Sequence, residues 1–301
     1  MHRWLARAGR PRALVGSQGH DAAVTRRPAG RLVSCLDQCI EGVHVDADVS
    51  PAHFGRKAVN RSLSDLAATA ASPTGILLGF SAPRDRSTRW MRSVITGARN
   101  AARAVGADLW GGDLGAAPGP ARLVVTALGE IERGGRPVGR DRARPGQWVV
   151  CTGALGGSIL GRHLRFEPRI EAGRRLAAAG ATAMMDLSDG LAWDTYRMAR
   201  ASSVRIELDA VPLHRDAQRR ARQTAQTCTW HALHDGEDHE LIATLPPARA
   251  RAALLAAARR GEGWSCIGRV VAGAGLQLIG AAADGTPRDW SPGEGGWRHG
   301  R

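Results

Sequence analysis

The chain has 301 residues, of which 43% are hydrophobic, and it carries a formal net charge of +14 at pH 7. This hydrophobic content supports a full core and excludes a largely disordered chain, and no apolar run reaches the roughly 18 residues of a transmembrane helix. Residues 1–12 are basic without the apolar stretch of a secretory signal, and the five cysteines show neither CxxC nor zinc spacing. We therefore expect a cytoplasmic protein with reduced thiols and no membrane association.

The positive charge consists almost entirely of arginine, because Lys57 is the single lysine. The arginines are spread along the chain and aromatic residues make up only 4%, so the clustering and stacking typical of nucleic-acid binding are weak. Nucleic-acid binding therefore ranks last among the functional hypotheses. We expect the basic surface to attract phosphorylated small molecules instead.

The first half of the chain predicts alternating strands and helices. Residues 31–45 indicate a strand, a turn and a second strand, with Asp37 at the turn. The other elements predicted here are helices over residues 51–71 and 88–105, strands over residues 75–80 and 123–131, and a turn rich in glycine over residues 110–113.

The second half continues the alternation after a boundary near Gly146, which divides the chain into domains 1–146 and 147–301. Several strands are joined by short turns, so an α+β fold with mixed sheets is favoured over a parallel, doubly wound sheet. The elements predicted here are strands over residues 148–152, 204–208, 241–245 and 265–271 and helices over residues 170–179, 191–201, 215–226 and 247–260.

The stretch Met185-Asp186-Leu187-Ser188-Asp189-Gly190-Leu191 places two carboxylates three residues apart, directly after a short apolar run. A helix that starts here would bring Asp186 and Asp189 close together. A strand that leads into an acidic turn suits Mg²⁺ and phosphate, because hard cations prefer oxygen ligands. By itself the pattern also fits an acidic cap on an ordinary helix, so it gains weight only from further carboxylates in similar settings.

Several acidic residues share the setting of a turn or helix edge beside Gly, Ser or Ala. Buried carboxylates repel one another unless a cation neutralises them, and an oxygen-only ligand set indicates Mg²⁺ rather than zinc. If the carboxylates converge, a metal site with a glycine-rich phosphate approach indicates phosphoryl transfer, and the chain has neither a Walker A sequence nor a kinase glycine loop. These residues are Asp21, Asp37, Asp65, Asp113 and the pair Asp186 and Asp189.

A series of short blocks, in order along nearly the whole chain, resembles the thiamine-monophosphate kinase family, which belongs to the superfamily of aminoimidazole ribonucleotide synthetase. Any one block is weak evidence, but their shared order is specific for the superfamily, and the Glu-Gly-Val-His and Gly-Glu-Asp blocks favour this family. The blocks are Gly19-His20-Asp21-Ala22-Ala23-Val24, Asp37 with Glu41-Gly42-Val43-His44, Gly55-Arg56-Lys57-Ala58, Asn60 with Leu63-Ser64-Asp65-Leu66-Ala67-Ala68, Gly111-Gly112-Asp113, Thr152-Gly153-Ala154-Leu155-Gly156, residues 185–191, and Gly236-Glu237-Asp238-His239-Glu240-Leu241.

The resemblance implies an α+β, two-domain aminoimidazole ribonucleotide synthetase-like fold with a C-terminal α/β sandwich. It also implies a homodimer in which the N-terminal mixed sheets pair. The implied reaction is transfer of the ATP γ-phosphate to thiamine monophosphate with Mg²⁺, without a covalent intermediate.

The same resemblance assigns roles to individual residues. Asp21, Asp37, Asp65, Asp113, Asp186 and Asp189 would bind metal, with Asp37, Asp65 and Asp186 forming the catalytic set. The nucleotide would contact Gly112, Asp113, Arg140 and Ser188. The thiamine phosphate would be held by His44, Glu237 and a C-terminal aromatic residue, either Trp290 or Trp297, because a thiazolium cation suits a carboxylate and an aromatic face.

Five positions depart from the family pattern. His20 replaces an Asp, Cys35 and Leu36 replace two hydroxyl residues, Leu114 replaces a Thr, and His239 replaces a Tyr. These changes motivate an alternative hypothesis: a relative that acts on another phosphorylated substrate, or one that binds nucleotide with little catalysis.

Overall fold

The computed structural model describes residues 13–15, 22, 24–25, 28–279 and 286–296. The chain forms two compact units, and each is described by itself. The N-terminal unit comprises Met1–Leu66, Ala71–Gly135 and Leu164–Ile170, and the C-terminal unit comprises Ala67–Ala70, Arg136–His163 and Glu171–Arg301. Within the described residues, no helix is both long and apolar enough to cross a membrane.

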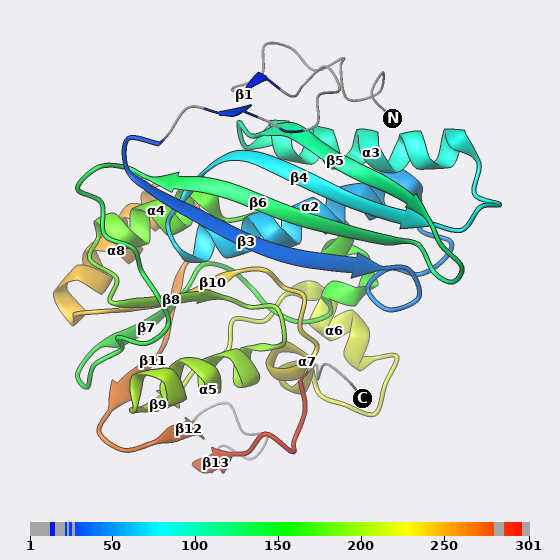
Figure 1. The fold of residues 1–301 in the computed structure, drawn as a ribbon. Coiled ribbons are helices and arrows are strands. Elements are labelled where there is room, and N and C mark those ends of the chain that lie inside the picture. The colour runs from blue at the N-terminus through cyan, green and yellow to red at the C-terminus, as the bar shows by residue number, and fades with distance from the viewer. Residues whose placement is uncertain (1–12, 16–21, 23, 26–27, 280–285, 297–301) are drawn as a thin grey trace. The chain divides into compact units, whose positions relative to one another are not determined.

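The N-terminal unit contains a four-stranded sheet in the order β3-β6-β4-β5, with two long helices on one face (Figure 1). β4 and β5 run parallel, and α3 supplies the crossover that a parallel pair requires. The strands are β3 (Arg31–Ile40), β4 (Ser72–Ala82), β5 (Asp108–Ala116) and β6 (Arg122–Ile131), and the helices are α2 (Pro51–Ala68) and α3 (Thr88–Ala104). A separate two-stranded sheet pairs β1 (Ala13–Val15) with β2 (Val24–Thr25).

The helix-covered face of this sheet forms the core of the N-terminal unit. Leu123, Val125 and Ala127 alternate along β6 toward the helices and are fully buried. The opposite face carries Leu32 and Leu36, which are 60% and 64% exposed. One face of the sheet is therefore packed, and the other presents apolar side chains.

The C-terminal unit contains a seven-stranded mixed sheet in the order β13-β12-β9-β11-β7-β10-β8. Helix α5 packs against this sheet and contributes Leu191, Ala192 and Met198 to a core cluster with strand residues such as Ile206 and Leu276. The strands are β7 (Trp148–Cys151), β8 (Ala183–Asp186), β9 (Arg205–Leu208), β10 (Leu241–Leu245), β11 (Ser265–Val271), β12 (Gly275–Leu278) and β13 (Arg288–Trp290). The helices are η1 (Ser158–Leu160), η2 (Arg162–Leu164), α4 (Ile170–Ala178), α5 (Leu191–Ser202), α6 (Arg215–Ala221), α7 (Cys228–His234) and α8 (Pro247–Arg259).

The predicted α+β class with mixed sheets is confirmed, but two local predictions are wrong. Asp37 lies inside β3 rather than at a turn, because β3 pairs with β6 over its whole length, and the glycine stretch 110–113 lies inside β5, paired with β4. Neighbouring strands satisfy the backbone groups that a turn would otherwise leave to water. Asp65 lies in the last turn of α2, at a helix edge as predicted.

Some elements of the second half also differ from their predictions. The helix predicted over residues 215–226 ends at Ala221, and α7 follows it without a predicted counterpart. Strands β12 and β13 were not predicted, since glycine-rich segments carry a weak strand pattern. The domain boundary near Gly146 stays a prediction.

Candidate active site

The acidic stretch leads from β8 into α5. Asp186 is the last residue of β8, and α5 begins at Leu191, so Asp186 and Asp189 do not share the first turn of a helix as predicted. Both carboxylates are nevertheless buried, at 7% and 6% exposure. We call residues 186–189 the acidic loop.

Asp194, in the first turn of α5, holds the acidic loop in place. Its buried carboxylate accepts hydrogen bonds from the Ser188 and Asp189 amides at 3.0 and 2.9 Å. Arg197 pairs with both Asp189 and Asp194. Burial and the nearby Asp189 raise the pKa of Asp194 well above its usual value. Sequence reasoning missed Asp194; the signal was an acidic residue in the first turn of the predicted helix.

The segment Asp235–Glu240 runs beside the acidic loop and is bound to it through the backbone. The Glu237 amide donates to the Ser188 carbonyl and the His239 amide to the Leu187 carbonyl, each at 2.8 Å. These bonds bring Ser188, predicted for the nucleotide, next to Glu237, predicted for the thiamine phosphate. Two predicted subsites of the C-terminal unit are therefore adjacent.

His239 lies against the candidate metal ligand Asp186. Its Nδ1 is 3.3 Å from Asp186 Oδ2, and both side chains are buried. His239 is one of the positions at which the chain departs from the family pattern, because a histidine replaces the expected tyrosine there.

The predicted N-terminal metal residues occupy different elements of their unit. Asp37 lies in β3 on the same face as Cys35, whose thiol donates to the Ser62 carbonyl of α2, so this face meets the helices. Asp65 lies in α2, whereas Asp113 lies in β5 and is exposed. Asp21 lies outside the described residues.

Gly112 precedes Asp113 and lies unusually close to β4. A Cβ atom at Gly112 would be 2.1 Å from the Leu78 carbonyl oxygen, so a side chain is excluded there. The glycine stretch therefore allows β5 to pack tightly against β4 just before Asp113.

His44 lies in the turn after β3 and is held by two contacts. Its Nδ1 accepts the Ile40 amide at 3.1 Å, and its carbonyl accepts a hydrogen bond from Lys57. Lys57 is fully buried, so it is not a solvent-exposed residue on the surface of α2. In the same motif, Glu41 pairs with Arg86 at 2.6 Å. These contacts hold the Glu-Gly-Val-His block in a turn, in which His44 is half-buried.

The remaining predicted residues of the C-terminal unit differ in burial. Arg140 is exposed in the loop that precedes β7, whereas Trp290 is 4% exposed. The Trp290 indole packs against Trp193 and Tyr196, and its N–H donates to His234 at 3.2 Å. This aromatic cluster covers the Trp290 ring, and the alternative residue Trp297 lies outside the described residues.

The donor chemistry of the acidic loop suits Mg²⁺. Asp186 and Asp189 both raise the pKa of Asp194 through charge repulsion. A divalent cation would relieve that repulsion, and carboxylate oxygens are its preferred ligands. In the described parts of the chain, no group of three or more His, Cys, Asp or Glu side chains is arranged to hold a metal ion.

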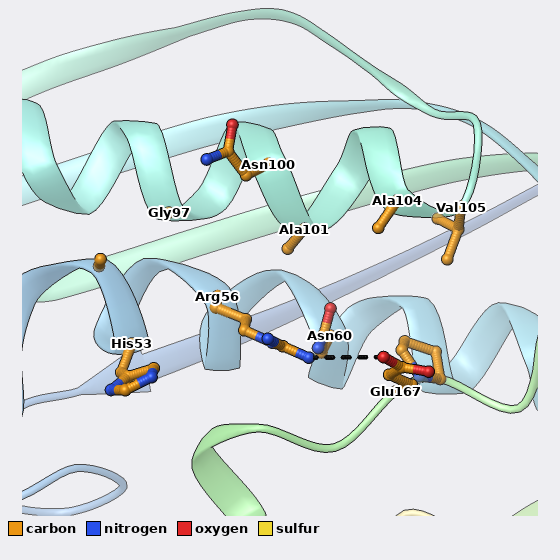
Figure 2. Close-up of a pocket in the computed structure, with 11 residues that line it drawn as sticks. His53, Arg56, Asn60, Gly97, Asn100, Ala101, Ala104, Val105 and Glu167 are labelled. Atoms are coloured by element: carbon orange, nitrogen blue, oxygen red, sulfur yellow. Dashed lines mark ion pairs between the residues drawn. The ribbon is translucent and has the colours of Figure 1, made fainter.

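A cavity of about 460 Å³ lies in the N-terminal unit between α2, α3 and the segment around Glu167 (Figure 2). Arg56 lines it, donating to the Arg165 carbonyl at 2.8 Å and lying 3.9 Å from Glu167. None of the predicted site residues is among the residues that line this cavity.

The family models match nearly the whole chain. The AIR synthase related protein N-terminal domain matches residues 19–131, and the C-terminal domain matches residues 121–281. The thiamine-monophosphate kinase of Rhodopirellula baltica is 36% identical over 278 residues, which cover 88% of this chain and 86% of that protein. The Mycobacterium tuberculosis enzyme of the same name is 33% identical over 309 residues, with 96% and 86% covered.

Solved structures agree with these matches. Thiamine-monophosphate kinase from Stenotrophomonas maltophilia has a TM-score of 0.80 at 31% identity and covers 91% of this chain and 93% of its own. The structure of AaThiL complexed with AMPPCP and TMP has a TM-score of 0.77 at 28% identity, with 89% and 87% covered. The family models and the relatives above 30% identity together span most of the sequence, so the chain belongs to the thiamine-monophosphate kinase family of AIR synthase related proteins.

Proposed function

We propose that this protein transfers the γ-phosphate of ATP to thiamine monophosphate and so produces thiamine diphosphate. The observation that carries the proposal is the backbone bond between Glu237 and Ser188, which joins a predicted substrate residue to a predicted nucleotide residue. The relatives named thiamine-monophosphate kinase support the reaction, as does the AaThiL complex, because AMPPCP is an ATP analogue.

The reaction is a direct displacement. An oxygen of the thiamine monophosphate phosphate forms a bond to the γ-phosphorus, and the bond from that phosphorus to the β,γ-bridging oxygen breaks, releasing ADP. The residues act mainly by positioning the two phosphates: Ser188 on the nucleotide side, and His44 and Glu237 on the thiamine side.

Each unit contributes residues that would bind Mg²⁺: Asp186 and Asp189 in the C-terminal unit, and Asp21, Asp37, Asp65 and Asp113 in the N-terminal unit. When bound, it would neutralise the charge of the phosphate oxygens. Between the two C-terminal tryptophans, Trp297 is the better candidate for the thiazolium, because the Trp290 ring is enclosed in its aromatic cluster.

We also propose that the protein is a cytoplasmic homodimer. Leu32 and Leu36 on the open face of the N-terminal sheet support pairing between two copies, since large exposed apolar patches mark interaction surfaces. The five cysteines are free thiols, which suits a reducing compartment.

The test is the formation of thiamine diphosphate by the purified protein with ATP, Mg²⁺ and thiamine monophosphate, followed by chromatography. We expect Asp186→Ala to lower product formation by about 100-fold or more, because a carboxylate ligand is lost. Asp209→Ala is the matched control, since Asp209 is an exposed carboxylate of the same unit, and it should retain activity.

Two results would contradict the proposal. Unchanged turnover in Asp186→Ala would remove the acidic loop from the site. No product from the wild-type chain, with ATP binding retained in calorimetry, would favour a relative with altered function, as the substitutions at Cys35 and Leu36 suggest.

A further inference from the structure

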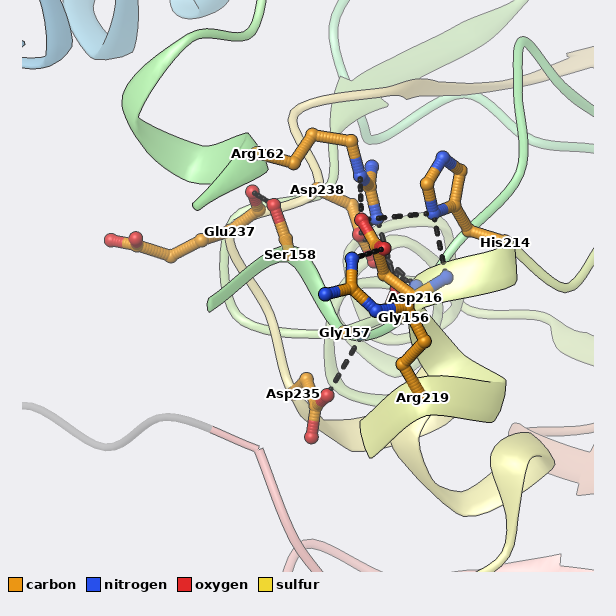
Figure 3. Close-up of polar contacts among 10 residues, drawn as sticks. All are labelled: Gly156, Gly157, Ser158, Arg162, His214, Asp216, Arg219, Asp235, Glu237 and Asp238. Carbon is orange, nitrogen blue, oxygen red and sulfur yellow. Dashed lines mark hydrogen bonds and ion pairs between the residues drawn. The ribbon is translucent and has the colours of Figure 1, made fainter. Parts of the chain in front are cut away.

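Three segments of the C-terminal unit meet around the backbone of Glu237. They are the acidic loop, the segment Asp235–Glu240, and residues 153–158, which we call the glycine turn. The glycine turn binds the neighbouring segment through its amides: Gly156 donates to the Asp238 carboxylate at 3.0 and 3.1 Å, and Gly157 donates to Asp235 at 3.0 Å (Figure 3). These amides therefore donate to carboxylates of the same chain and do not form a binding site for phosphate.

Asp238 is the central acceptor of this contact. Its side chain is 1% exposed, and it accepts a hydrogen bond from Arg162 Nη2 at 2.9 Å in addition to the Gly156 amide. The same Nη2 atom donates to the Gly156 carbonyl, also at 2.9 Å. Arg162 thus ties both the glycine turn and Asp238 to one guanidinium group.

The backbone of Glu237, next to Asp238, is held from both sides. Its amide donates to the Ser188 carbonyl at 2.8 Å, and its carbonyl accepts from Ser158 Oγ at 2.7 Å. Its φ of +55° lies in the left-handed region, which is unfavourable for a residue with a side chain and persists only where the surroundings enforce it.

The Glu237 side chain points out of this network (Figure 3). Figure 3 shows the side chain directed away from Arg162 and Asp238; it is 22% exposed, and its carboxylate lies 3.5 Å from His163 Nδ1. The network therefore fixes where the Glu237 side chain starts.

We propose that Arg162 and Asp238 form a clamp that positions Glu237 for its substrate, an inference that rests on the proposed function. The clamp locks the glycine turn against Asp235–Glu240, so that Ser158 and Ser188 can fix the Glu237 peptide between them. Arg162 and Asp238 act through the backbone around Glu237, so we assign them as positioning residues.

The test compares Asp238→Asn with Asp216→Asn. Asp216 is also a buried carboxylate beside Arg162, at 3.9 Å from its Nε, but its side chain pairs with His214 and Arg219. Assayed at about pH 8, above the Asp238 pKa of about 7, Asp238→Asn should raise KM for thiamine monophosphate about tenfold and leave KM for ATP within about twofold. Asp216→Asn should leave both constants near the wild-type values.

Amide hydrogen exchange without substrates provides a readout independent of activity. In Asp238→Asn, the amides of Gly156, Gly157 and Glu237 should exchange faster than in the wild type, whereas Asp216→Asn should not change them. If Asp238→Asn does not fold, Arg162→Lys serves instead, because it keeps the positive charge and loses the bridging geometry of the guanidinium.

The possible outcomes separate the two proposals. Faster exchange with an unchanged KM for thiamine monophosphate would overturn the positioning role, as would equal effects of the Asp238 and Asp216 substitutions. A wild-type chain that forms no thiamine diphosphate would instead overturn the proposed function. In that case unchanged exchange in Asp238→Asn would also overturn the clamp.

Discussion

Asp238 shows at the residue scale how burial changes an ordinary carboxyl group. Burial raises the pKa of Asp238 from 3.8 to about 7, although Arg162 and the Gly156 amide favour the charged form. Between about pH 4 and pH 7 the folded chain therefore keeps a proton at Asp238 that the unfolded chain releases, so the stabilising contribution of this proton is lost as pH rises through about 7. We expect the free energy of unfolding of the wild type, relative to Asp238→Asn, to be larger at about pH 5 than at about pH 8.

Urea denaturation of both proteins at the two pH values measures this difference. Other titrating groups are common to the two proteins and cancel in the comparison. A difference that is independent of pH would show that Asp238 does not bind the proton in the folded state.

At the element scale, helices α2 and α3 cross with their backbones in contact. A Cβ atom at Gly97 would lie 2.0 Å from the Ala52 carbonyl oxygen, and one at Gly55 would lie 2.0 Å from the Val94 carbonyl oxygen. Alanine is the better helix former by about 1 kcal/mol, but here it would have to separate the two helices. We expect Gly97→Ala to lower the free energy of unfolding by roughly 2–3 kcal/mol.

Thermal or urea unfolding measures this effect, with Gly115→Ala as the control. An added Cβ at Gly115 meets no atom within 4 Å, so its stability should change little. Equal stabilities of the two variants would mean that the helices adjust to a side chain at their crossing without loss.

At the scale of the whole molecule, the open face of the N-terminal sheet bears on assembly. Leu36 on this face is 64% exposed, which matches Leu255 on α8 at 63%. If two copies pair through this sheet, Leu36→Arg would bury a charge in the interface and yield a monomer. Leu255→Arg should remain dimeric.

Sedimentation of the wild type and both variants over a range of protein concentrations tests the assembly. A monomeric wild type would contradict the homodimer proposal. A dimeric Leu36→Arg would place the interface on another surface of the molecule.

Local patterns in the sequence determined much of the architecture. Apolar periodicity predicted α2, α3, α5 and α8 to within a few residues, because one buried face of a helix recurs every three or four positions. The order of the motif blocks predicted the family, which the comparisons confirm. The residue roles that follow from the family stay predictions, since they depend on ligands.

Tertiary structure alone decided the features that depend on partners distant in sequence. Asp37 lies in a strand because β6, far along the chain, supplies its ladder, and Lys57 is buried because it reaches the His44 carbonyl. The sequence does not indicate hydrogen-bond partners for the amides of Gly156 and Gly157, which donate to Asp238 and Asp235 in the structure. Local pattern reports propensity and periodicity, whereas the pairing of buried polar groups is settled only when the segments meet, because each group must find a partner there.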